Sequence, residues 1–252
     1  MMMFSNIKGL SDFAGKLTVL AEEKPKMNLS ERSVDKFQIY DERGLKVNTD
    51  QFETREQYIA ETFILEEDIV LELGARYGSV SVKANKKLKI PTNQVVVEPD
   101  ETVWDALEYN KKINGCEFHI VKGTISKDKM ALNNDGYGTT SHIDETSKIP
   151  NYSLNEIKNK YNITHFTVLI ADCEGFLEYF IDENPEILHE CRLITYECDN
   201  SENCNYEKIK NKILENNFKC VVDGVHTVFI KNSYNFPTNS IGRSSFSFSM
   251  FS

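Results

Sequence analysis

Short apolar runs alternate with longer stretches of helical periodicity from about residue 69 onward. Each run ends at a glycine or a polar residue, which is typical of strands buried in a sheet. The runs cover residues 69–73, 94–98, 117–122, 166–171, 192–196, 218–222 and 227–230. Apolar positions recur at helical spacing over 101–113 and 205–216. Strands that alternate with helices in this way predict a parallel sheet covered by crossover helices.

The last two runs are separated by a turn that contains Asp223-Gly224. Because Asp-Gly between two strands favours a hairpin, the last strand is expected to be antiparallel. The fold class predicted is therefore α/β and Rossmann-like, a doubly wound and mostly parallel sheet of seven strands. It has helices on both faces and extends over residues 61–231.

Two segments fall outside this pattern. Residues 1–60 are charged and weakly periodic, which predicts a partly helical N-terminal extension with one helix at 52–65. Residues 232–252 are rich in serine and phenylalanine and have no period that would bury a face, so we expect an irregular tail. Residues 126–150 form a long connection, and long loops in compact domains are usually functional or mobile.

Composition narrows the function classes. The sequence has 29 Lys and Arg and 39 Asp and Glu, a formal net charge of −10. This charge disfavours binding of nucleic acid, because no stripe of basic residues offsets it. No apolar run is long enough to span a membrane. The six cysteines show no C-x-x-C spacing, and Cys191, Cys198 and Cys204 fit no common zinc finger. These features predict a reduced, cytoplasmic protein.

Ligands of open α/β sheets bind outside the carboxyl ends of the strands, so the polar residues there carry the candidate chemistry. The stretch from Glu72 to Ser79 supplies a bend at Gly74 and a second side-chain-free position at Gly78. Arg76 stands where a dinucleotide fingerprint needs glycine, and no Gly-Lys-Ser/Thr of a phosphate loop follows. The turn therefore predicts a ligand without a pyrophosphate.

Glu98 ends the second strand, where its carboxylate can accept two hydrogen bonds from ribose hydroxyls. Glu72, just before the turn, favours a cationic ligand end such as an ammonium or a sulfonium. The two features together favour a bound adenosine, and the alternative for each alone is an ordinary strand-turn-helix junction.

Three stretches of the sequence resemble class I S-adenosylmethionine-dependent methyltransferases, and specifically their FkbM-like branch. They are residues 71–79, the Glu98-Pro99 pair and the run 170–175 that contains Asp172, Glu174 and Gly175. The resemblance covers residues 60–231. Ala171 and Arg76 depart from the residues that many members carry at these positions, and Arg76 puts the shape of the donor pocket in question.

The resemblance implies a sheet of strand order 3-2-1-4-5-7-6, with S-adenosylmethionine over residues 74–78. It also implies methyl transfer to a hydroxyl of a sugar, a glycan or another small molecule. The cofactor-binding residues it implies are Glu72, Gly74, Ala75, Gly78, Glu98, Pro99, Gly123, Thr124 and Asp172.

Methyl transfer to a hydroxyl needs in-line alignment and removal of a proton. The catalytic candidates are Asp172, Glu174 and His142, although Glu174 equally fits a helix N-terminal acid and His142 a surface loop histidine. Asp172 and Glu197 are candidate oxygen ligands for Mg²⁺ or another divalent cation, which would lower the pKa of the acceptor hydroxyl.

Two other functions remain open. An RNA ribose 2′-O-methyltransferase would normally use a Lys-Asp-Lys-Glu set, but no lysine lies between Asp172 and Glu197. A non-catalytic nucleoside-binding scaffold of the same fold is the third possibility. The sequence leaves the acceptor and the oligomeric state open.

Overall fold

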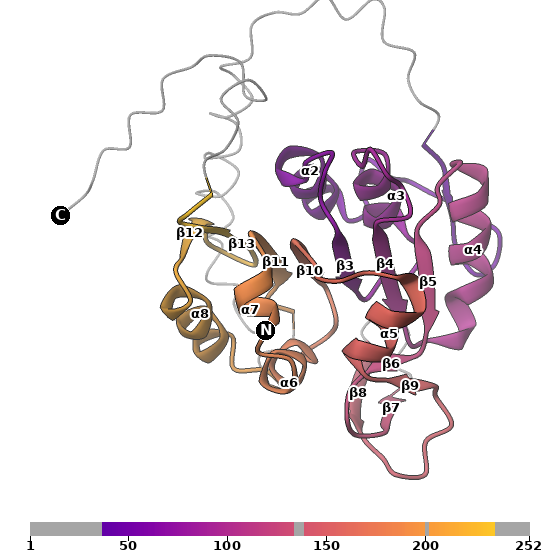
Figure 1. Ribbon diagram of the computed structural model, residues 1–252. Coiled ribbons are helices and arrows are strands. Elements are labelled where there is room, and N and C mark those ends of the chain that lie inside the picture. The colour runs from indigo at the N-terminus through magenta and orange to yellow at the C-terminus, as the bar shows by residue number, and fades with distance from the viewer. Residues whose placement is uncertain (1–36, 134–138, 200–201, 235–252) are drawn as a thin grey trace, which may run out of the picture. The chain divides into compact units, whose positions relative to one another are not determined.

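A seven-stranded sheet is the centre of the computed structural model, which describes residues 37–133, 139–199 and 202–234 (Figure 1). The strand order is β12-β13-β11-β10-β3-β4-β5. The strands are β3 (Val70–Leu73), β4 (Gln94–Glu98), β5 (His119–Lys122), β10 (Val168–Ala171), β11 (Leu193–Glu197), β12 (Phe218–Val222) and β13 (His226–Lys231).

The sheet has the predicted topology. Read from β5, its order is 3-2-1-4-5-7-6 in the order of these strands along the chain. The last strand, β13, is antiparallel to both β11 and β12, and lies between them rather than at the edge. The other pairings of the sheet are parallel. This is a Rossmann-like α/β fold with a mostly parallel sheet of seven strands, and the predicted fold class is confirmed.

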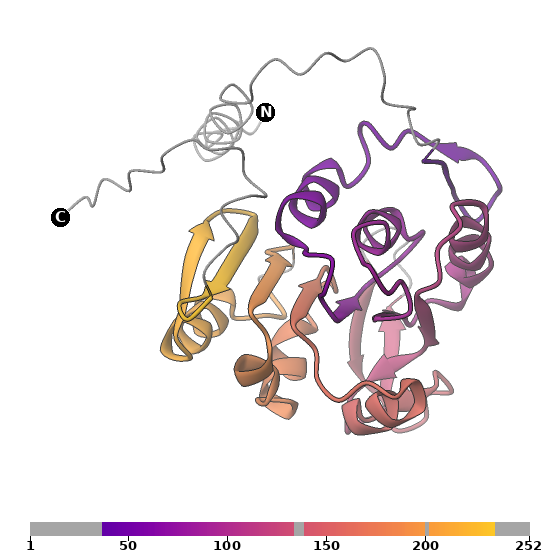
Figure 2. The same ribbon diagram turned by 45° about the horizontal axis from the view of Figure 1, so that its top comes forward.

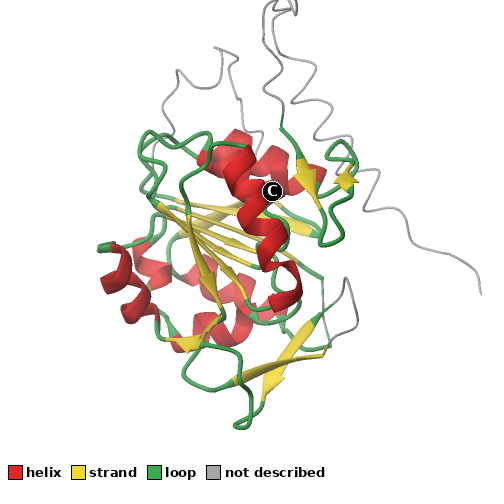
Figure 3. Ribbon diagram, turned by 90° about the vertical axis from the view of Figure 1, so that its right-hand side faces the viewer, coloured by secondary structure: helices red, strands yellow, loops and turns green. Residues whose placement is uncertain are grey.

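Helices cover both faces of the sheet because alternate strand residues point to opposite sides (Figures 2 and 3). Leu71, Leu73 and Val97 face one core, whereas Val96 faces the other. The first core contains side chains of α5 (Leu154–Tyr161), α6 (Leu177–Glu183), α7 (Ile187–Glu190) and α8 (Tyr206–Glu215). The opposite face carries α2 (Thr54–Phe63), α3 (Ser79–Asn85), the 3₁₀ turn Glu101–Val103 and α4 (Trp104–Ile113).

The described part of the expected N-terminal extension packs on this second face. The short strands β1 (Ile39–Tyr40) and β2 (Lys46–Val47) pair with each other, and Ile39 is fully buried. The side chain of Asn110 on α4 accepts from the Tyr40 N–H and donates to the Tyr40 carbonyl, at 2.9 and 2.8 Å. The boundary expected at residue 60 falls inside α2, and residues 37–232 belong to one compact unit.

The long connection after β5 contains four short strands. They are β6 (Thr124–Ile125), β7 (Met130–Asn133), β8 (Thr140–Ile143) and β9 (Asn151–Tyr152). β7 and β8 form an antiparallel hairpin, and β6 pairs with β9. Residues 134–138 of this connection, residues 1–36 of the expected extension and residues 235–252 of the expected tail lie outside the described residues.

Helix α5 begins at a capping box that the hydrophobic pattern alone does not reveal. The Ser153 hydroxyl accepts from the Glu156 N–H at 3.2 Å, and the Glu156 carboxylate accepts from the Ser153 N–H at 2.7 Å. Two donors that the first turn of a helix leaves unpaired are thus satisfied.

Replacing Ser153 with alanine is expected to lower the free energy of unfolding by about 0.5–2 kcal/mol, the usual contribution of such a cap. Urea unfolding followed by circular dichroism measures it. Asn155 is exposed on the same turn, so Asn155→Ala is the matched control, with an expected change within about 0.5 kcal/mol. Equal midpoints for Ser153→Ala and the wild type would contradict the contribution of the cap.

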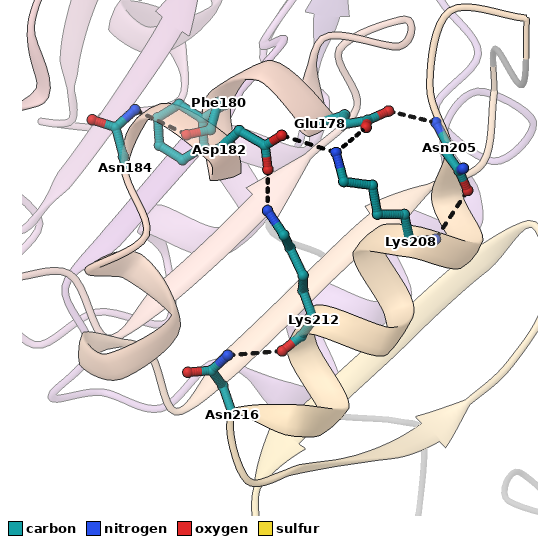
Figure 4. Close-up of polar contacts among 8 residues, drawn as sticks. All are labelled: Glu178, Phe180, Asp182, Asn184, Asn205, Lys208, Lys212 and Asn216. Carbon is teal, nitrogen blue, oxygen red and sulfur yellow. Dashed lines mark hydrogen bonds and ion pairs between the residues drawn. The ribbon is translucent and has the colours of Figure 1, made fainter.

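Helices α6 and α8 are connected by ion pairs on their exposed sides (Figure 4). The Lys208 ammonium lies 2.6 Å from Glu178 and 3.0 Å from Asp182, and Lys212 pairs with Asp182 as well. Exposed pairs of this kind contribute little singly, but a network that shares one carboxylate fixes how the two helices lie against each other.

The six cysteines are free thiols. The groups of possible metal ligands found among the described residues contain no cysteine, so the fold gives no sign of a zinc finger at Cys191, Cys198 and Cys204. Within the described ranges, none of the helices has the length and apolar character needed to cross a bilayer.

Candidate functional site

A cleft opens at the carboxyl ends of the parallel strands, beside β3. The chain runs outward from β3 to β4 on one side and to β10 on the other, and this reversal of strand order is where open α/β sheets bind ligands. The cleft has a cavity volume of about 100 Å³ and is open to solvent on one side. Its lining includes Glu53, Gly74, Arg76, Glu98, Pro99, Asp100, Gly123, Thr124, Leu132, Ser141, Asp172 and Glu174.

The chain turns at Gly74 immediately after β3, in contact with the end of β10. Gly74 has a φ of +83°, and a Cβ there would lie 1.6 Å from the backbone oxygen of Asp172. The Gly74 N–H donates to the carbonyl of Val97 at 3.0 Å. No other residue can therefore make this turn without moving β10, and the turn brings backbone, rather than side chains, to the edge of the cleft.

Glu98, at the end of β4, holds the turn in place. Its two carboxylate oxygens accept from the backbone N–H groups of Arg76 at 2.6 Å and Asp100 at 2.8 Å. Glu98 is only 5% exposed. Burial raises the pKa of its carboxyl and the two hydrogen bonds lower it, and the result is a pKa of about 7. Because each oxygen has two lone pairs and uses one here, Glu98 can still accept from two further donors in the cleft.

Glu72 does not reach the cleft, contrary to its expected role toward a cationic ligand. Its neighbours Leu71 and Leu73 point to the face that carries α5 to α8, so the alternation of β3 turns Glu72 to the other face. There it is 2% exposed and accepts from Ser81 Oγ at 2.8 Å and Gln94 Nε2 at 3.1 Å. Glu72 is thus a buried carboxyl group beneath α3.

This burial gives a testable pH dependence of stability. Burial raises the pKa of Glu72 to about 8 from a usual value of 4.5. The folded protein retains the proton while the unfolded chain loses it, so stability falls as pH rises from about 4.5 to about 8. Glu72→Gln, which keeps the shape and cannot ionise, is expected to be more stable than the wild type at pH 8 by on the order of 1–3 kcal/mol.

Urea midpoints at pH 5 and pH 8 measure the effect. The difference in unfolding free energy between Glu72→Gln and the wild type should shrink at pH 5, where the side chain at position 72 is neutral in both folded proteins. Glu67 is exposed in the loop before β3, so Glu67→Gln is the matched control. Its urea midpoints at pH 5 and pH 8 should equal those of the wild type. A difference that is the same at pH 5 and pH 8 would argue against ionisation of Glu72.

Glu53 and Asp100 are acids of this cleft that the sequence did not predict, and Glu53 comes from the segment before β3. It caps α2 at its N-terminus with a φ of +47° and hydrogen-bonds the hydroxyl of Ser79. Burial raises the pKa of Glu53 to about 7. Its position depends on how the chain before β3 folds back over the strand ends, and no local pattern reveals that packing.

Asp172 follows β10 and lies between the cleft and a smaller cavity, since it lines both. Its N–H donates to the carbonyl of Leu73 at 3.0 Å, which joins the ends of the two central strands. Burial, and then the charges of Glu197 and Glu53, raise the pKa of Asp172 well above its usual range. A positive charge that binds beside this carboxyl group would lower its pKa again.

The carboxylates expected to share a metal lie in two different groups. Asp172 lies with Glu174 and Asp199, whereas Glu197 lies with Glu56 and His226. The Glu174 N–H donates to the Asp199 carboxylate at 2.7 Å. The proposed pairing of Asp172 with Glu197 as ligands of Mg²⁺ or another divalent cation therefore has no support here.

His142 lies outside the cleft. It is exposed on β8, while its neighbour Ser141 lines the cleft, because successive residues of a strand point to opposite sides. The hairpin thus supplies a hydroxyl to the cleft instead of an imidazole.

The other expected cofactor residues divide in a similar way. Pro99, Gly123 and Thr124 line the cleft. Ala75 is buried beneath the turn and Gly78 is the N-cap of α3, so both shape the turn without lining the cleft.

The cleft can hold a nucleoside that carries a positive charge. Glu53, Glu98, Asp172 and Glu174 line it, and among the described residues of its lining Arg76 is the one basic side chain. Burial is the main cause of the raised pKa values of these acids. A cationic ligand would stabilise their ionised forms, whereas a phosphate would add to the repulsion.

No protein-family model matches the sequence, and no curated protein matches it. Several solved structures are similar in fold. A precorrin-6y C5,15-methyltransferase from Geobacter metallireducens is 12% identical over 73% of this chain and 91% of its own, with a TM-score of 0.43. A protein of the NADB-Rossmann superfamily from Streptococcus agalactiae is 8% identical over 74% of this chain and 72% of its own, with a TM-score of 0.45. A tRNA m1G37 methyltransferase from M. jannaschii is 12% identical over 72% of this chain and 49% of its own, at 0.41.

Proposed function

We propose that this protein is an S-adenosylmethionine-dependent O-methyltransferase that acts on a hydroxyl of a sugar, a glycan or another small molecule. The observation that carries the proposal is the cleft at the strand-order reversal, where the Gly74 turn touches the backbone of Asp172 and Glu98 closes the adjacent strand. The Gly74 turn, the acid proposed to bind the ribose (Glu98) and the acid on the acceptor side (Asp172) thus lie around one cavity.

The donor chemistry fits these residues. Glu98 has lone pairs left for a ribose diol, and the acids around it favour a ligand with a sulfonium and an ammonium group. Bound S-adenosylmethionine would supply an electrophilic methyl group. Backbone at residues 74–76 and at 123–124 bounds the space in which the adenosine lies.

Asp172 is the residue that we assign to the proton of the acceptor hydroxyl. Burial and the neighbouring acids raise its pKa, and a positive charge bound in the cleft would lower it. The ionised carboxylate can then accept a hydrogen bond from the acceptor hydroxyl, orient its oxygen in line with the methyl group and remove the proton. Glu174, next but one along the chain, has a raised pKa from burial and extends the acidic wall on the same side.

The acceptor we propose is a small molecule rather than RNA. The walls of the cleft are acidic, and the hairpin that closes one side contributes Leu132 and Ser141 instead of a basic surface. A phosphate backbone would be repelled here. The mixed apolar and hydroxyl lining suits a polar, uncharged acceptor.

Calorimetry with S-adenosylmethionine and S-adenosylhomocysteine tests the first half of the proposal. We expect both to bind at micromolar concentrations, and the absence of binding would overturn it. Transfer from labelled S-adenosylmethionine to a panel of sugars, glycans and short RNAs tests the second half. Binding of donor without transfer to any acceptor would favour a nucleoside-binding scaffold, and transfer to RNA alone would exclude the small-molecule acceptor.

A further inference from the structure

Three side chains outside the donor cleft converge from three separate elements. Glu56 comes from the first turn of α2, Glu197 ends β11, and His226 begins β13 directly opposite Glu197 in the strand pairing. His226 Nδ1 lies 3.3 Å from Glu56 Oε1, and Nε2 lies 3.7 Å from Glu197 Oε1. One possible ligand atom from each of the three lies within 4.8 Å of the others.

His226 is buried, the two carboxylates are half-buried, and the group carries no compensating basic side chain among the described residues. His226 is 6% exposed, and its Nδ1, which faces Glu56, has no hydrogen-bond partner. Among the described residues, no lysine or arginine forms an ion pair with Glu56 or Glu197. A neutral imidazole has a lone pair on one ring nitrogen, and a carboxylate oxygen lies beside each nitrogen of His226. Buried charges of this kind are usually paired or bind a metal ion.

The space beside these side chains has the size of a single ion or water molecule. A cavity of about 20 Å³ is lined by Glu56, Glu197 and His226, together with Asp172. A ligand atom about 2.0–2.2 Å from a tetrahedral zinc-sized ion lies about 3.3–3.6 Å from the next ligand. His226 Nδ1 and Glu56 Oε1, 3.3 Å apart, already have that spacing, and the ligand atoms that the three residues offer lie within 4.8 Å of one another, so Glu197 reaches an ion there with a small side-chain movement.

We propose that Glu56, Glu197 and His226 bind one divalent cation of the class that accepts imidazole and carboxylate ligands together, such as Mn²⁺ or Zn²⁺. Two carboxylates and one neutral imidazole balance its charge, and water completes the coordination. The ion fixes the first turn of α2, and with it Glu53, against the ends of β11 and β13. This inference does not depend on the proposed methyl transfer.

The second group of possible ligands, Asp172, Glu174 and Asp199, has no comparable support. It consists of carboxylates alone, and one of them already accepts from the Glu174 N–H. It serves as the internal control for the site at His226.

Mn²⁺ is the probe of choice because the six free thiols would bind Zn²⁺ on their own. The full chain is treated with chelator, dialysed and titrated with Mn²⁺, and free Mn²⁺ is followed by electron paramagnetic resonance. We expect one Mn²⁺ per chain at micromolar affinity and a rise in the melting temperature. Glu197→Gln and His226→Asn are each expected to weaken binding at least about tenfold.

Asp199→Asn and the exposed His142→Asn are the controls and should bind Mn²⁺ as the wild type does. Circular dichroism checks that each variant is folded, and Glu56→Gln, at a half-buried position of α2, replaces His226→Asn if that variant unfolds. Three results would overturn the proposal: no stoichiometric Mn²⁺ in the folded wild type, unchanged affinity in Glu197→Gln and Glu56→Gln, or loss in Asp199→Asn alone.

Discussion

Replacing Asp172 with asparagine is expected to lower the rate of methyl transfer by about 10²–10⁴-fold, the range that general base catalysis supplies. Asparagine has the same size but cannot take up the proton of the acceptor hydroxyl. The dissociation constant of S-adenosylmethionine is expected to change far less, because the Asp172 backbone atoms that meet Leu73 and Gly74 remain in place. Single-turnover rates and calorimetry measure the two quantities separately.

The matched control for this variant is Asp223→Asn, in the exposed turn between β12 and β13, which should leave both quantities unchanged. The pH profile provides a second check. The wild-type rate should rise with pH through the ionisation of Asp172 in the donor complex, and this limb should be absent from the residual rate of Asp172→Asn. Full activity in Asp172→Asn would assign proton removal to another group, and Glu53 is the next acid in the cleft.

The sheet was predictable because each buried strand is a short apolar run with a polar or glycine end. The runs at 94–98 and 218–222 coincide with β4 and β12, and the Asp223-Gly224 turn gave the antiparallel last strand. The hairpin of β7 and β8 was not predicted because both of its strands are mostly polar or half-exposed. Helix α5 was missed although Ser153 and Glu156 carry the spacing of a capping box.

The strand-end rule placed Gly74, Glu98 and Asp172 around one cleft, since parallel strands bring their carboxyl ends to the same edge. It failed for Glu72, because a residue near a strand end can still point away from the cleft. His142 was a candidate from its place in the long connection, and it is exposed on β8 outside the cleft. The apolar neighbours Leu71 and Leu73 carried that information for Glu72. For Glu53 and His226 no such signal exists, since their positions depend on the packing of α2 and β13.

Replacing Glu98 with alanine is expected to weaken binding of S-adenosylmethionine by about 1.5–3 kcal/mol, or about 10- to 150-fold. The carboxylate is the group placed to accept from the ribose hydroxyls, and its loss also frees the N–H groups of Arg76 and Asp100. Calorimetry gives the dissociation constant. Glu117→Ala, at an exposed position just before β5, is the matched control and should bind as the wild type does.

A double comparison separates ribose binding from damage to the turn. S-adenosylhomocysteine and an analogue without the ribose 2′- and 3′-hydroxyls are titrated into the wild type and Glu98→Ala. If Glu98 holds the ribose, removal of the hydroxyls weakens binding strongly in the wild type and hardly at all in the variant. If Glu98 only fixes the Gly74 turn, the hydroxyls matter equally in both proteins, and the ribose assignment fails while the rest of the cleft stands.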